Sequence, residues 1–214
     1  MRQVAIGVVV LALSSVQLLA QAAPAGQRST APRGGGARAA APAAAPAYTP
    51  AKKSPDAGPV LVFEPVKGTF EIETYPTEAP KTVEHIVGLV RRNFYNGQRV
   101  HRVVPGFVVQ FGDPQSRDMT KKDRWGTAGS GKPIGVAEFN PKRTHILGAV
   151  AMAHAGDAKL ADSQMYITLA PTPRLNGSYT VFGKIISGMD IVQKLAINDV
   201  IRRATVRAET PATK

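Results

Sequence analysis

The feature that most constrains this chain is a series of short β-type runs between residues 59 and 207, interrupted only twice by a helical period. Runs rich in Val, Ile, Phe and Thr that are bounded by Gly, Pro or polar residues are typical of strands. The strand candidates are residues 60–64, 69–74, 99–104, 107–111, 146–153, 164–170, 179–186 and 200–207. About 150 residues are enough for one domain with a substantial core.

Two segments change to a helical period. After Pro80, the apolar residues Val83, Ile86, Val87 and Val90 predict an amphipathic helix of about four turns that ends at Gly97. A second short helix is expected over residues 189–196, after Ser187-Gly188. Two helices are too few for alternating βαβ winding, and closing a sheet removes its exposed edges. We therefore expect one mainly β domain, a closed eight-stranded antiparallel β-barrel capped by two α-helices, over residues 59–207.

The first 22 residues are typical of a secretory signal peptide. Arg2 is followed by an apolar run over residues 4–13 and by the cleavage-like motif Ala20-Gln21-Ala22. An uncleaved membrane anchor is the alternative, but Ser14, Ser15 and Gln17 interrupt a run that is already short for a bilayer. We expect an exported protein, periplasmic or secreted, with no stable membrane insertion after cleavage.

Residues 23–58 are expected to form a disordered tether rich in Ala, Pro and Gly. Between residues 21 and 50, 21 of 30 residues are of these three types. Such a segment has too little apolar surface to offset its ordering entropy. Residues 208–214 are expected to be a flexible tail, and a monomer is the default for a domain of this size.

Composition excludes several functions. There is no Cys among the 214 residues, which removes disulfides, thiol nucleophiles and zinc ribbons. The net charge of +12 is spread along the chain, +5 on the first 56 residues and +7 on the rest, so we expect no nucleic-acid partner. The four histidines have no metal-ligand spacing, and we expect neither metal nor cofactor.

Two apparent motifs are weak. The run GTAGSGKP at 126–133 is close to a phosphate-binding loop, but Pro133 stands where a hydroxyl is needed, so a Gly-rich surface loop is preferred. His154, Asp157 and Ser163 could be imagined as a hydrolytic triad, yet no nucleophile elbow surrounds Ser163.

The run VHRVVPGFVVQFGD at 100–113 is more informative. Two strands joined by a Pro105-Gly106 turn would bring the guanidinium of Arg102, the ring of Phe107 and the amide of Gln110 together. The alternative for this run alone is a hairpin with one exposed Arg.

This run resembles the cyclophilin signature. The resemblance continues in order through APKTVEHIVGL (79–89), GAVAMAHA (148–155), DSQMYITLA (162–170) and LNGSYTVFGKIISGMDIV (175–192). It implies a bacterial-type cyclophilin, whose family fold is a closed eight-stranded antiparallel barrel with two helices. The implied activity is peptidyl-prolyl cis/trans isomerisation of proline-containing unfolded or extended polypeptides.

The resemblance also implies site roles. Arg102 matches the arginine on which isomerisation depends. The substrate-binding positions are Phe107, Val108, Gln110, Ala153, His154, Gln164, Tyr166, Leu175 and Tyr179. Phe107, Tyr166 and Leu175 match the proline pocket. Gln110 and Gln164 match amides that hold the substrate backbone.

Three departures from the family pattern stand out. Arg174 lies where the best-known eukaryotic members have Trp, which predicts weak sensitivity to cyclosporin. His154 replaces Asn at the peptide-binding edge, and the stretch 114–132 is long for a bacterial member.

The expected function is a prolyl isomerase that assists folding of exported proteins. The alternative is a proline-peptide binding module or holdase chaperone with little catalysis.

Overall fold

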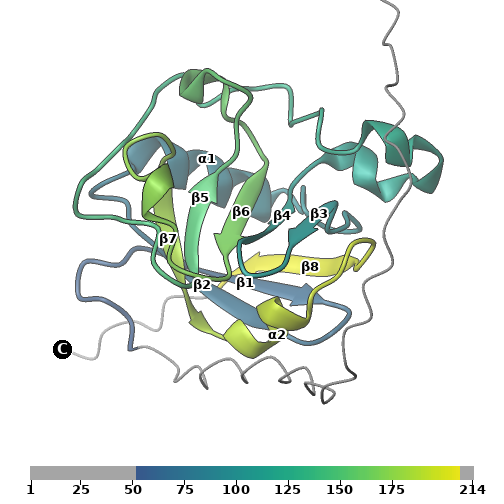
Figure 1. Cartoon of the computed structure of the whole chain (residues 1–214), viewed down its shortest axis with the longest axis horizontal. Helices are drawn as coiled ribbons and strands as arrows, with labels where there is room; N and C mark the ends of the chain where they lie inside the picture. The colour runs from purple at the N-terminus through teal and green to yellow at the C-terminus, as the bar shows by residue number, and fades with distance from the viewer. Residues whose placement is uncertain (1–51, 208–214) are drawn as a thin grey trace, which may run out of the picture. The chain divides into compact units, whose positions relative to one another are not determined.

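The computed structural model describes residues 52–207 (Figure 1). The predicted signal peptide (1–22), residues 23–51 of the predicted tether and the tail 208–214 lie outside the described residues. Each predicted β-type run overlaps one strand. The strands are β1 (Val60–Pro65), β2 (Phe70–Thr74), β3 (Arg102–Val104), β4 (Val108–Phe111), β5 (Ala149–Met152), β6 (Met165–Thr168), β7 (Val181–Ser187) and β8 (Ile201–Val206).

These eight strands form one antiparallel sheet in the order β3-β4-β6-β5-β7-β2-β1-β8. Figure 1 shows β8 beside β1 and the sheet curling around its core. The mainly β prediction is confirmed.

The prediction of a closed barrel is wrong, because no ladder joins β3 to β8 and the sheet is a curled half-barrel. The segment before β3 meets the start of β8 at an isolated bridge between Arg99 and Val200. Backbone bonds from Gly97 to Ile201 and from Val100 to Asp199 accompany it. The physical reason is that β3 is only three residues long, so the segment before it takes over the contact with the start of β8.

Helix α1 (Pro80–Arg91) begins with Pro80 in its first turn, as predicted, but it ends before Gly97. Asn93 adopts a positive φ of 56°, which stops the helix there. The start of α1 has no side-chain cap of its own; instead the carboxylate of Glu138 accepts from the backbone N–H groups of Lys81 and Thr82. The predicted four-turn helix is therefore too long by its last turn.

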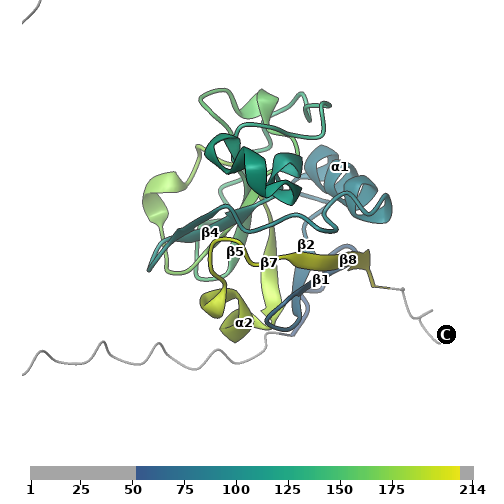
Figure 2. The same cartoon turned by 90° about the vertical axis from the view of Figure 1, so that its right-hand side faces the viewer.

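Helix α2 (Met189–Lys194) follows Gly188, whose φ is 77°. The helices α1 and α2 lie at opposite ends of the curled sheet (Figure 1, Figure 2). Four short 3₁₀ helices occupy the loops: η1 (Pro114–Arg117), η2 (Met119–Arg124), η3 (Ala158–Leu160) and η4 (Pro173–Leu175). Within residues 52–207, no helix has the length and apolar character needed to cross a membrane.

The pleat of the sheet separates two apolar clusters. Successive residues of a strand point to opposite faces, so Val109 and Phe111 of β4 join the main core while Val108 does not. The main core packs Phe63, Phe70 and Phe111 against one another at centroid distances of 5.4–6.3 Å. On the opposite face a smaller cluster forms from Val108, Ala149, Ala151, Tyr166 and Val181. Two members of this outer cluster, Val108 and Tyr166, also line the candidate site described below.

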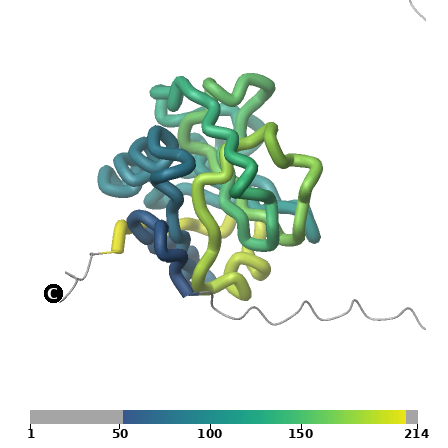
Figure 3. Tube along the Cα trace, turned by 90° about the vertical axis from the view of Figure 1, so that its left-hand side faces the viewer, coloured from purple at the N-terminus to yellow at the C-terminus, as the bar shows by residue number. Residues whose placement is uncertain are grey.

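The segment before β1 also contacts the sheet. Ser54 donates through its backbone N–H and its hydroxyl to the buried carboxylate of Glu73, and Gly58 donates to the carbonyl of Thr74. Contacts with β2 therefore begin before the predicted domain start at residue 59. The first and last described segments lie close together (Figure 3), joined by a bond from Arg207 to Val60.

Candidate active site

The register of the sheet places the central site residues in one row. Arg102 of β3 lies opposite Gln110 of β4, Gln110 lies opposite Tyr166 of β6, and Tyr166 lies opposite Ala151 of β5. Residues that are directly opposite on neighbouring strands share a face of the sheet. The guanidinium, the amide and the phenol ring therefore stand side by side on the outer face.

A cavity of about 260 Å³ opens at this row. Its lining is Arg102, Phe107, Val108, Gln110, Ala153, His154, Tyr166, Leu175 and Tyr179. These are nine of the ten predicted site residues. The tenth, Gln164, lines the adjoining cavity together with Gln110.

The floor and walls of the cavity are apolar. Val108 and Tyr166 are buried in the outer cluster, and Phe107, Leu175 and Tyr179 pack against that cluster from loops. Gly106 has a φ of 68°, so the turn between β3 and β4 adopts a conformation that a side chain would strain. This turn sets Phe107 at the edge of the cavity. The chamber suits one small apolar ring.

A directed chain of hydrogen bonds orients the polar side of the cavity. Arg102 Nη1 donates to Gln110 Oε1 at 3.4 Å, and Gln110 Nε2 donates to Gln164 Oε1 at 3.0 Å. Gln164 Nε2 donates in turn to the carbonyl of Ala128 at 2.8 Å. Arg102 is exposed and forms no ion pair with the described residues. Its other N–H groups are therefore available to a ligand.

The Tyr166 hydroxyl is held from behind by a buried histidine. Asn176 Oδ1 can only accept, so His145 Nδ1 carries the proton of this 2.9 Å bond. His145 Nε2 then accepts from the Tyr166 hydroxyl at 2.9 Å. His145 is 2% and Tyr166 5% exposed. Burial lowers the pKa of His145 and raises the pKa of Tyr166, so both rings stay neutral.

His154 forms the opposite rim of the cavity. Its Nε2 lies 3.0 Å from the carbonyl of Ser178 and must donate to it, and its ring packs on Tyr179 with centroids 4.5 Å apart. Its buried Nδ1 then has a free lone pair, because no described residue bonds to it.

Ser163 is fully buried and donates to the carbonyl of Gly112 at 2.7 Å. The hydrolytic triad is therefore absent from the described residues.

The adjoining cavity, about 470 Å³, is walled partly by the Gly-rich loop 126–131. This loop is tied to the end of β4, because Asp113 accepts from the backbone N–H groups of Gly126, Thr127 and Ala128 at 2.6–3.1 Å. From the sequence we predicted only a surface loop here. The small residues of this loop allow its backbone to approach a carboxylate closely, but the sequence does not indicate that Asp113 is that carboxylate.

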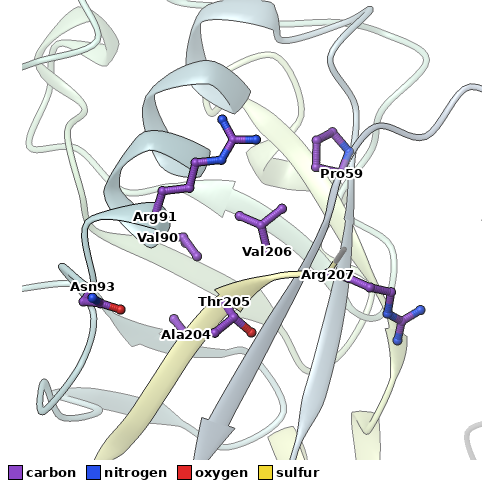
Figure 4. Close-up of a pocket in the computed structure, with 8 residues that line it drawn as sticks. All are labelled: Pro59, Val90, Arg91, Asn93, Ala204, Thr205, Val206 and Arg207. Atoms are coloured by element: carbon purple, nitrogen blue, oxygen red, sulfur yellow. The ribbon is translucent and has the colours of Figure 1, made fainter. Parts of the chain in front are cut away.

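Another hollow of about 480 Å³ lies between the end of α1 and β8 (Figure 4). Figure 4 shows Arg91 of α1 at its rim and Val90 and Val206 between the two elements. It contains none of the predicted site residues, and Arg207 there pairs with Glu71.

No group of three or more His, Cys, Asp or Glu residues in the described part of the chain could hold a metal ion.

The class of protein follows from what lines the cavity. Its lining includes no Ser, Cys or carboxylate that could attack a substrate, but it offers an apolar chamber beside one guanidinium and one amide. Such a site suits an enzyme that changes the conformation of a bound chain. A family model described as "Cyclophilin type peptidyl-prolyl cis-trans isomerase/CLD" matches residues 60–212.

Curated relatives agree with the family model. A probable peptidyl-prolyl cis-trans isomerase of Brucella abortus is 41% identical over 157 residues, which cover 67% of this chain and 80% of that protein. Peptidyl-prolyl cis-trans isomerase B of Bacillus subtilis is 40% identical over 137 residues, covering 64% and 90%. The chain belongs to the cyclophilin-type peptidyl-prolyl cis-trans isomerases, and it is an enzyme of that activity.

Solved structures support the fold. A cyclophilin-type isomerase of Cryptosporidium parvum, also solved in the presence of the dipeptide Ala-Pro, superposes with a TM-score of 0.61 at 22% identity. It covers 71% of this chain and 99% of its own. A cyclophilin of Hirschia baltica gives a TM-score of 0.59 at 22% identity, covering 72% and 74%.

Proposed function

We propose that this chain accelerates rotation about X-Pro bonds in exported polypeptides and so assists their folding, with Arg102 as its catalytic residue. The observation that carries this proposal is the position of Arg102, which lines the apolar cavity and lies directly opposite Gln110 on the neighbouring strand. Proline-containing unfolded or extended chains are the substrates, and no metal or cofactor takes part.

Rotation about an X-Pro bond needs no nucleophile. The barrier of about 18–20 kcal/mol comes from amide resonance, and uncatalysed exchange takes tens of seconds or more. In the twisted state the proline nitrogen regains its lone pair. A guanidinium that donates to this nitrogen binds the twisted state more tightly than the planar one, which lowers the barrier. An arginine side chain suits this role because its planar guanidinium presents several N–H donors in a fixed geometry.

The site is expected to hold one side of the X-Pro bond and to let the other side rotate. The chamber formed by Phe107, Tyr166 and Leu175 would hold the proline ring, so the chain that precedes proline turns. Gln110 orients Arg102 through its Oε1, and Gln164 fixes Gln110 in turn. A ten-thousandfold acceleration requires about 5.4 kcal/mol, which one charge-assisted hydrogen bond and an apolar chamber can share.

His154 forms part of the rim of the cavity. Its Nε2 donates to the carbonyl of Ser178 and its Nδ1 is buried, so it offers the substrate the surface of a ring packed on Tyr179. The backbone contact that the family makes with Asn is therefore altered in this chain. His154→Ala should therefore weaken peptide binding more than it lowers the rate of isomerisation of the bound peptide.

The alternative is a proline-peptide binding module or holdase chaperone with little catalysis. The His154 departure gives it some weight, because an altered contact with the substrate backbone does not by itself speed rotation. Exchange NMR and a binding titration with the same proline peptide and one preparation separate the two. An isomerase shows exchange broadening at substoichiometric enzyme. A pure binder shows affinity with unchanged cis/trans exchange, and that result would overturn the proposal.

Export and the monomeric state are part of the proposal. They rest on the signal-like residues 1–22 and on the size of the domain. Cell fractionation with intact-mass analysis tests the first. We expect a periplasmic or secreted product that begins at Ala23, whereas a full-length product in the cytoplasmic fraction would contradict export. Light scattering tests the second.

A further inference from the structure

Arg174 lies at the mouth of the cavity and forms no ion pair with any residue of the described range 52–207. It is the middle residue of η4, between Pro173 and the cavity residue Leu175. Its guanidinium carbon lies 4.6 Å from the centroid of the Phe107 ring, and that of Arg102 lies 5.7 Å from the same centroid. Two cationic groups therefore share one aromatic wall of the cavity.

No carboxylate among the described residues neutralises this pair. Neither Arg102 nor Arg174 takes part in an ion pair there, and the cavity lining holds no Asp or Glu. The adjoining cavity holds one, Asp162, whose oxygens are already bonded to His85, Ser130 and the backbone of Gly131. A peptide in the site therefore meets unopposed positive charge.

Contact with an aromatic face leaves the edge of a guanidinium free. The planar N–H groups of Arg174 lie over or beside the Phe107 ring, where they can still donate to an approaching carboxylate. Phe107 would touch the proline ring of the substrate. A carboxylate that reaches Arg174 must therefore come from a residue close to that proline.

We propose that Arg174 gives this isomerase a preference for prolyl peptides that carry Asp or Glu immediately beside the proline. This preference rests on the proposed function, because it takes the cavity as the proline pocket. A solvent-accessible ion pair predicts roughly a two- to fivefold gain in kcat/KM. Salt should reduce that gain, since exposed charges are screened.

The test compares Glu and Gln peptides, with the acidic or amide residue placed before the proline in one pair and after it in another. Isomerisation is followed by exchange NMR, and Kd by titration, for the wild type, Arg174→Gln and Arg174→Lys. Arg202→Gln is the matched control: it makes the same charge change on β8, whose residues line neither cavity. The readout is the Glu/Gln ratio within each protein, so a general loss of activity cancels.

We expect the ratio to exceed one for at least one peptide pair in the wild type, in Arg174→Lys and in Arg202→Gln, and to fall to about one in Arg174→Gln. Equal ratios in wild type and Arg174→Gln would overturn the preference. Turnover of Gln peptides without any preference would leave the isomerase intact and refute only this inference. If no peptide is turned over, the proposed function fails, and the Kd ratios still decide the preference.

Discussion

Tyr166 and His145 show how far single residues of the site depend on distant partners. The two side chains are 21 positions apart in the chain, and their hydrogen bond lies beneath the apolar cavity. The resemblance placed Tyr166 in the pocket from its own motif. Nothing in the sequence around residue 145 showed that a buried histidine would hold its hydroxyl, because the pairing exists only once the strands are assembled.

Changing Tyr166→Phe should lower the free energy of unfolding by about 1–3 kcal/mol, because it leaves His145 Nε2 buried without a partner. The ring remains, so the cavity keeps its wall and isomerisation should stay within a few-fold of wild type. Urea unfolding measures the first effect. Tyr179→Phe is the matched control, since the Tyr179 hydroxyl makes no hydrogen bond to another residue between 52 and 207. Equal losses in both variants would contradict the role of His145.

The ten site residues were predicted from the resemblance, and the structure brings nine of them around one cavity. Residue patterns alone suggested only Arg102, Phe107 and Gln110, because these share one hairpin. The position of Arg174 on Phe107 was not predictable, since η4 and the hairpin meet only in the folded sheet.

At the scale of elements, strands were predictable because each is a short run with its own period, and every predicted run overlaps one strand. Boundaries were less predictable. The apolar spacing of α1 continued to Phe94, yet the helix ended earlier because Asn93 adopts a left-handed conformation. Closure of the sheet failed for a similar reason, because the length of β3 depends on its pairing and not on its composition.

The loop 126–131 owes its position to one carboxylate. Asp113 accepts bonds from Gln115 as well as from the loop, and it is fully buried. Asp113→Asn replaces a carboxylate that accepts four N–H donors with an amide that has only one acceptor oxygen. We expect the free energy of unfolding to fall by roughly 3 kcal/mol.

The same change should raise KM for peptides more than it lowers kcat, because the loop walls the adjoining cavity directly and reaches Arg102 only through Gln164 and Gln110. Chemical unfolding and steady-state kinetics measure both. Asp123→Asn controls for the lost charge, because Asp123 is exposed in η2 and its carboxylate makes no hydrogen bond or ion pair with another described residue. If Asp113→Asn changes the free energy of unfolding and KM no more than Asp123→Asn does, the hydrogen bonds between Asp113 and the loop contribute little to stability or to peptide binding.

For the whole molecule, two histidines link stability to pH. Burial lowers the pKa of both His101 and His145 below the ordinary value of about 6.5. Below that pH the unfolded chain binds protons that the folded chain does not. The free energy of unfolding should therefore fall as pH drops from about 7 toward 5, by up to about 1.4 kcal/mol per pH unit for each histidine.

Urea titrations at several pH values check this slope. His145→Gln should make it shallower, because one of the two buried groups no longer titrates. A free energy of unfolding that is constant between pH 7 and 5 would show that these rings are as accessible to protons in the folded state as in the unfolded chain.

The catalytic role of Arg102 is the central claim, and kcat/KM of Arg102→Ala for a neutral proline peptide tests it most directly. Arg102 is exposed on a short strand, so the variant should unfold at the same urea concentration as wild type. Arg202→Ala, which is also exposed, on β8, controls for charge. We predict that Arg102→Ala loses roughly a hundredfold or more in kcat/KM, as expected when a donor to the transition state is removed, while Arg202→Ala loses nothing. Turnover of Arg102→Ala near that of wild type would contradict the account.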